Sequence, residues 1–212
     1  MVENGSLVKL EYVAYIDGQQ VEKPSKPLIV AVGQKQVLPG LDEALLKAEL
    51  EKEVSVTIPP EKGYGERNPD LVRLVPMELF RRQGIDPVVG MPVELDNMQA
   101  RVQSVSGGRV RVDFNPELAG KTIDYKFKIV EQLKTPLAKI DAIAKQFLGD
   151  SVRSFYEVDF KEAKIEVDSD TCLKQGYFGS KGRMIAMLLA HLDEVKTLKI
   201  VEEYAKDKLP LE

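Results

Sequence analysis

The chain has 212 residues, 43% of them hydrophobic and 30% charged, with a net charge of −4. This balance is typical of a globular protein, and the length allows one large domain or two to three small ones. No apolar run reaches the roughly 18 residues that a membrane helix needs, and the first residues lack the features of a signal peptide. The lone Cys172 suits a reducing compartment, so we expect a cytoplasmic protein without membrane attachment.

The distribution of charged and ligating residues excludes several classes of function. The chain is acidic overall, so nucleic-acid binding through Arg81, Arg82, Arg109 and Arg111 is the weakest of the hypotheses. His191 is the only histidine, which excludes multi-histidine metal sites. On an apolar helix we interpret it as a packed or edge residue, and Cys172 as structural. We expect no metal and no cofactor.

The first half of the chain reads as strands around one short helix. Apolar residues alternate from Val8 to Ile16, Asp17-Gly18 marks a hairpin turn, and a second strand covers 28–32. Pro39-Gly40 forms a sharp corner into a helix that closes near Leu50. Strands at 54–58 and 123–129 complete the pattern.

A segment of different character, residues 71–114, interrupts that pattern. It has its own helix signal at 76–80, strands around 93–95, 100–102 and 110–114, and a turn at 106–108. Its own strands and turns indicate an inserted domain. Its Met and Phe side chains either form a small core or remain exposed as an adaptable apolar surface.

The last segment, residues 136–212, reads as a third, α/β domain. A helix is expected over 137–147 and ends at Gly149. Strands follow at 156–160 and 163–167, and Ser180 caps a helix that runs to Val195. That helix is apolar almost all round, which indicates burial on several sides. A strand at 198–201 ends the pattern.

Several motifs together resemble the FKBP-type peptidyl-prolyl cis–trans isomerases. They are Tyr12, Asp17-Gly18 with Val21-Glu22, Leu28-Ile29-Val30, Val37-Leu38-Pro39-Gly40-Leu41, Gly63-Tyr64-Gly65 and Tyr125-Lys126-Phe127. The segments Leu71–Pro76 and Asn115–Gly120 resemble the borders of the insert-in-flap domain of the SlyD-like branch. The extra C-terminal segment is similar in position to that of the long archaeal members.

The resemblance implies an α+β fold in three parts. An antiparallel half-barrel wrapped on the short helix would comprise 1–70 and 115–135, a small, mainly β insert-in-flap domain 71–114, and a C-terminal α/β domain 136–212. It also implies a pocket lined by nine residues, to which we assign catalysis: Tyr12, Glu22, Leu28, Val30, Val37, Leu38, Leu41, Tyr64 and Phe127. Three positions depart from the family, which often has Trp at Leu41, Asp at Glu22 and His at Pro116.

The function expected from this resemblance is isomerisation of Xaa-Pro bonds in unfolded client proteins, combined with chaperone activity. The insert would capture the client through Met77, Leu79, Phe80, Met91 and Met98. The alternative is a non-catalytic, client-holding chaperone on an isomerase-like scaffold, which the three departures favour. The C-terminal domain would form a homodimer or, alternatively, dock on its own chain.

Overall fold

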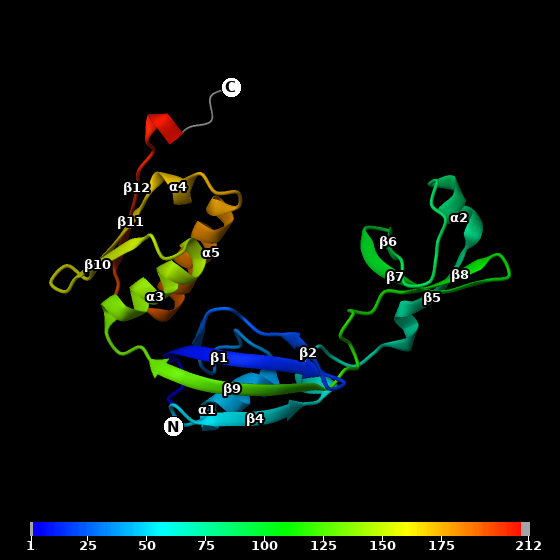
Figure 1. Cartoon of the computed structure of the whole chain (residues 1–212), viewed down its shortest axis with the longest axis horizontal. Helices are drawn as coiled ribbons and strands as arrows, with labels where there is room; N and C mark the ends of the chain where they lie inside the picture. Colours follow the sequence, from blue (N-terminus) through cyan, green and yellow to red (C-terminus); the bar gives the residue numbers. More distant parts are fainter. Residues whose placement is uncertain (1, 209–212) are drawn as a thin grey trace. The chain divides into compact units, whose positions relative to one another are not determined.

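The computed structural model describes residues 2–208, so both chain ends of the predicted domains, residue 1 and 209–212, lie outside the described part. The chain divides into two compact units, 2–56 with 124–208, and 57–123. Figure 1 shows the elements of each unit. The predicted mixed α+β class is confirmed, with mainly antiparallel sheets and few helices. The separate unit begins fourteen residues before the insert boundary expected at 71 (71 − 57 = 14).

The first sheet follows from alternating apolar residues along its long strands. It contains β1 (Leu7–Ile16), β2 (Gln19–Glu22), β3 (Leu28–Ala31), β4 (Glu53–Ile58) and β9 (Ile123–Gln132). Its order is β2-β1-β9-β4, and β3 also pairs with β1. Asp17 and Gly18 both have positive φ, which forms the expected two-residue hairpin turn.

The short helix α1 (Pro39–Lys47) begins at the Pro-Gly corner as expected but ends three residues before Leu50 (50 − 47 = 3). Leu50 instead forms an isolated bridge with Ile129 of β9. The helix buries Leu41 and Leu45, two side chains four residues apart on one helical face.

The C-terminal elements form a three-stranded sheet with helices on it. In order they are α3 (Pro136–Leu148), β10 (Arg153–Glu157), β11 (Glu162–Val167), α4 (Ser169–Cys172), α5 (Tyr177–His191), β12 (Thr197–Glu202) and the 3-10 turn Lys206–Lys208. The β10 and β11 strands pair antiparallel, and β11 and β12 pair parallel across the α4–α5 connection. Parallel neighbours require such a crossover.

The boundaries of two elements in this segment were predicted wrongly. The helix α5 begins at Tyr177 and not at Ser180, because Gly176 at φ 80° provides the turn into it. It ends at His191 and not at Val195. The strand expected over 156–160 is β10 at 153–157. Phe160 lies in the hairpin turn beside Lys161, whose φ is 51°.

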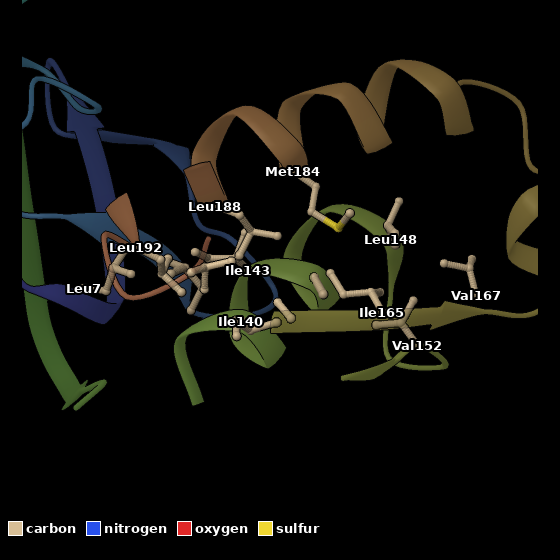
Figure 2. Close-up of a cluster of buried hydrophobic side chains, with 14 of the residues drawn as sticks. Leu7, Ile140, Ile143, Leu148, Val152, Ile165, Val167, Met184, Leu188 and Leu192 are labelled. Atoms are coloured by element: carbon tan, nitrogen blue, oxygen red, sulfur yellow. The ribbon is translucent and has the colours of Figure 1, made fainter. Parts of the chain in front are cut away.

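The C-terminal elements pack on the first sheet of the same chain. A buried cluster contains Leu7, Ile29 and Ala31 of the sheet and Leu133 just after β9, together with residues of α3 and α5. Figure 2 shows Leu7 beside Leu192, with Leu188 of α5 and Ile143 of α3 in the same cluster. The opposite face of the sheet is also apolar. It carries Val8, Leu10 and Val30, which are buried and alternate along β1 and β3 with the residues of this cluster.

The inserted unit has its own sheet and core. It contains the 3-10 turns Pro60–Lys62 and Pro69–Leu71, β5 (Val72–Pro76), α2 (Met77–Arg82), β6 (Pro92–Leu95), β7 (Met98–Ser106) and β8 (Arg109–Asp113). The strand order is β5-β8-β7-β6. Phe80 packs with Val93, Ala100, Val102, Val110 and Val112 in its core. Within residues 2–208 no helix is long and apolar enough to span a bilayer.

Candidate active site

Two aromatic residues of the predicted pocket lie opposite each other on the central strands β1 and β9. Tyr12 of β1 is the cross-strand partner of Phe127 of β9, so both side chains lie on the same face of the sheet. Phe127 is fully buried and Tyr12 half-buried. The Tyr12 ring also lies 5.7 Å from the ring of Tyr125, centroid to centroid. These contacts form an aromatic wall with one partly accessible member, Tyr12.

The phenol of Tyr12 is held by Glu22. Its hydroxyl donates to Oε1 of Glu22 at 2.5 Å, because the β1–β2 hairpin folds the two residues onto neighbouring strands. The register shift between Ala14 and Tyr15 lies beside this contact. Although Glu22 is one methylene longer than the Asp common in the family, it still reaches the tyrosine hydroxyl.

The strand β3 brings Leu28 and Val30 beside β1. Leu28 pairs with Leu10, and Val30 pairs with Val8, so these side chains share the sheet face that carries Tyr12. Val30 is buried and Leu28 half-buried. The expected apolar residues of β1, β3 and β9 therefore meet on one surface.

The connection from β3 to α1 carries Val37 and Leu38 and is held by Asp42. One carboxylate oxygen of Asp42 accepts from Gly33 N–H at 2.7 Å, and the other accepts from Lys35 N–H at 2.9 Å. Sequence reasoning missed this buried residue. The signal for it was available in the sequence: Asp42 is an acidic residue in the first turn of a helix, and a glycine turn precedes that helix.

Leu38 offers a backbone donor at the start of α1. It is the N-cap residue, and its carbonyl accepts from Asp42 N–H at 2.9 Å. Its own N–H donates to no acceptor within the part of the chain that the structure describes. Val37 and Leu38 are half-buried, whereas Leu41 is buried one turn further along the helix.

Tyr64 stands in the inserted unit. It lies between Gly63 and Gly65 after the 3-10 turn Pro60–Lys62, and its side chain is 43% exposed. Its role in the pocket stays a prediction, as do the roles of the other eight assigned residues.

The five predicted client contacts have different surroundings. Phe80 is completely buried in the core of the insert, so its assignment as a client contact is corrected. Met77 and Met91 are half-buried and pack against the same core. Leu79 and Met98 are exposed. Sequence reasoning missed three other exposed apolar side chains of this unit, Leu74, Val88 and Val89.

A hollow of about 440 Å³ lies against the same two strands. It is lined by the 23–27 segment, Glu53 and residues of β1 and β9, which include Tyr12 and Phe127 as well as Glu11, Val13, Lys126 and Lys128. The last four positions alternate with Tyr12 and Phe127 along the strands, so their side chains lie on the opposite face of the sheet.

The comparisons with known proteins agree with this architecture. Residues 1–76 match the family described as FKBP-type peptidyl-prolyl cis-trans isomerase, and residues 73–118 match the one described as FKBP26, IF domain. The second range lies within the separate unit 57–123.

The chain is also similar to named members of this family. It is 31% identical to a short-type peptidyl-prolyl cis-trans isomerase of Methanocaldococcus jannaschii, over 61% of this chain and 92% of that protein. It is 30% and 34% identical to the FKBP-type isomerases SlyD of Helicobacter pylori and Vibrio cholerae, over 61% of this chain in each case and 77% and 67% of those proteins. The chain belongs to the FKBP-type peptidyl-prolyl cis-trans isomerase family.

Proposed function

We propose that this chain catalyses cis–trans isomerisation of Xaa-Pro bonds on the sheet face that carries Tyr12 and Phe127. The observation that supports this most directly is the Tyr12–Phe127 pair with its Glu22 contact, in a chain of this family. Phe127 and the aliphatic side chains of β3 hold the proline ring. Tyr12 remains partly accessible beside them.

The chemistry needs neither a nucleophile nor a metal. The barrier of about 20 kcal/mol comes from lost amide resonance, and the planar amide is more polar than its twisted transition state. A dry apolar surface therefore favours the twisted form. The Leu38 N–H, which donates to no acceptor among residues 2–208, is available to hold a peptide carbonyl while the bond turns. Rotation thus depends on placement and desolvation.

The inserted unit is proposed to capture unfolded clients. Leu74 and Val89 are 62% and 69% exposed, and Leu79, Val88 and Met98 are exposed as well. Five exposed apolar side chains in one small domain fit a surface that adapts to extended apolar segments. This combination supports an isomerase with chaperone activity, whose clients are unfolded, proline-containing chains.

A homodimer through the C-terminal domain is the third part of the proposal. Met184 and Leu188 of α5 are buried against the same chain, whereas Phe178 and Leu189 remain exposed for a second copy. Two linked client sites would raise the effective concentration of the second site for a client that is already bound at the first. Light scattering on the wild type and on Leu189→Glu tests the dimer.

The decisive experiment is proline-limited refolding of an unfolded protein with catalytic amounts of this chain. The Phe127→Ala variant tests the pocket, and deletion of 71–114 tests the insert. A short glycine linker suits the deletion, because Asn68 and Asn115 hydrogen-bond to each other at 2.8 and 2.9 Å.

We expect the wild type to accelerate the slow phase and Phe127→Ala not to. The deletion should retain activity on a short peptide and lose it on the unfolded protein. If the slow phase is unchanged while aggregation is suppressed by wild type and Phe127→Ala alike, the chain is a non-catalytic holding chaperone.

A further inference from the structure

The outer edge of β3 is sealed by two side-chain amides. Ile29 and Ala31 pair with Lys9 and Leu7 of β1. On the other edge, the Ile29 N–H donates to Oε1 of Gln146 at 2.5 Å, and its carbonyl accepts from Nε2 of the same side chain at 3.5 Å. The Ala31 N–H donates to Oε1 of Gln36 at 2.8 Å. An edge strand normally leaves such groups unpaired.

Both amides connect β3 to the C-terminal domain. Gln146 belongs to α3, so its contact joins the domain to the strand directly. Gln36 belongs to the connection that leads to Val37 and Leu38, and its Nε2 lies 2.6 Å from Nε2 of His191 at the end of α5. The domain therefore reaches both segments that carry apolar residues of the proposed pocket.

The direction of the Gln36–His191 hydrogen bond follows from the Gln36 amide. Because Gln36 Oε1 already accepts from Ala31, its NH₂ group faces His191. An amide nitrogen only donates, so His191 Nε2 must be the acceptor and its proton lies on Nδ1. Burial lowers the pKa of His191, which favours this neutral form.

From these contacts we infer that His191 and Gln146 are positioning residues for isomerisation. They hold β3 and the connection before α1 in the geometry that presents Leu28, Val30, Val37 and Leu38 to the proline. The inference rests on the proposed function. The buried cluster that the C-terminal domain shares with the first sheet keeps the domain in place. The hydrogen bonds of Gln146 and His191 then fix the orientation of β3 and of the connection before α1.

Full-length variants test the inference. His191→Ala removes the acceptor for Gln36, whereas His191→Gln supplies a carbonyl oxygen in its place. Gln146→Ala removes the contact with Ile29. The matched control is Lys139→Met, which breaks the 2.7 Å ion pair with Glu194 inside the C-terminal domain.

Activity is measured on a short proline peptide, with kcat and KM separated. We expect His191→Ala and Gln146→Ala to lower kcat/KM between about twofold and tenfold, the range that corresponds to one hydrogen bond. His191→Gln and Lys139→Met should stay near wild type. Amide hydrogen exchange should be faster at Ala31 in His191→Ala and at Ile29 in Gln146→Ala.

Two outcomes would overturn the inference. One is unchanged activity and exchange in both alanine variants. The other is an equal loss of activity in Lys139→Met, which would mean that general loosening of the domain is responsible. An inactive wild type would refute the proposed function instead, and the exchange rates would still decide whether the two amides hold β3.

Discussion

Replacing Asp42 by alanine tests how the connection before α1 is held. Asp42 is 6% exposed, and its carboxylate accepts from two backbone N–H groups, those of Gly33 and Lys35. Lys35 has φ 58°, a conformation that costs a non-glycine residue about 1 kcal/mol or more. Hydrogen bonds to a charged group contribute about 1.5–3 kcal/mol each. Water reaches the freed N–H groups in this exposed turn, so we expect a net loss of about 2–4 kcal/mol of unfolding free energy.

The same substitution should lower activity, because Val37 and Leu38 lose their support. We expect kcat/KM on a short proline peptide to fall about tenfold, which corresponds to 1.4 kcal/mol at the transition state. Urea unfolding is followed by far-UV circular dichroism, since the chain contains no tryptophan. Both measurements use the full-length chain.

Two further variants give the comparison its reference points. Asp42→Asn keeps one acceptor oxygen and should lie between wild type and alanine in both stability and activity. Lys47→Ala, at the exposed end of the same helix, should change stability by no more than about 0.5 kcal/mol. A loss below about 1 kcal/mol in Asp42→Ala, or full activity, would show that the turn holds its shape without the carboxylate.

Three other predictions concern the insert and the domain contact. Phe80→Ala should destabilise the 57–123 unit by about 3–5 kcal/mol, because it empties the centre of its core, and limited proteolysis should then cleave within that unit. Replacing the exposed Leu74 and Val89 by serine should weaken suppression of client aggregation and leave short-peptide activity intact. His191 faces Gln36, and burial rather than a neighbouring charge lowers its pKa, so the unfolded state binds the proton more tightly. Wild-type stability should therefore decrease relative to His191→Gln as pH falls below about 6.5, and parallel melting curves from pH 7.5 to 5.5 would contradict this.

The strands of the first sheet could be predicted because their residues alternate. Leu7–Ile16 and Ile123–Gln132 place apolar side chains at every second position, and Asp17-Gly18 specifies a turn with positive φ. The end of α5 and the position of β10 could not be predicted in the same way. Apolar residues continue beyond the ends of both elements, so periodicity alone did not locate their boundaries.

The side of a helix that faces a core is a tertiary property, and this limited the predicted client surface. Met77, Leu79 and Phe80 are neighbours in the short helix α2, yet Phe80 is buried while Leu79 is 46% exposed. A helix of six residues is too short for its apolar pattern to define one face. The sheet β5-β8-β7-β6 decides which of these side chains enters the core.

The residues that hold the site have no periodic signal at all. Gln36, Asp42 and Gln146 act through hydrogen bonds to backbone groups of distant or turning segments. Family resemblance identifies the residues expected at the proline, whereas of these supporting residues Gln146 belongs to the attached C-terminal domain. The interpretation of His191 as a packed or edge residue agrees with its partial burial. Its hydrogen bond to Gln36, 155 positions away in the sequence, had no signal in the sequence.

The C-terminal domain therefore bears on catalysis through a strand of only four residues. A strand of four residues forms few backbone hydrogen bonds with its neighbours, and β3 pairs with β1 along one of its edges. If α3 and α5 were absent, the other edge of β3 would expose the backbone of Ile29, and in part that of Ala31, to water. The apolar side chains of Leu7 and Ile29 would be exposed as well. Removing residues 136–208 would thus loosen the same strand that carries Leu28 and Val30. A truncated chain should bind proline peptides more weakly even where its half-barrel remains folded.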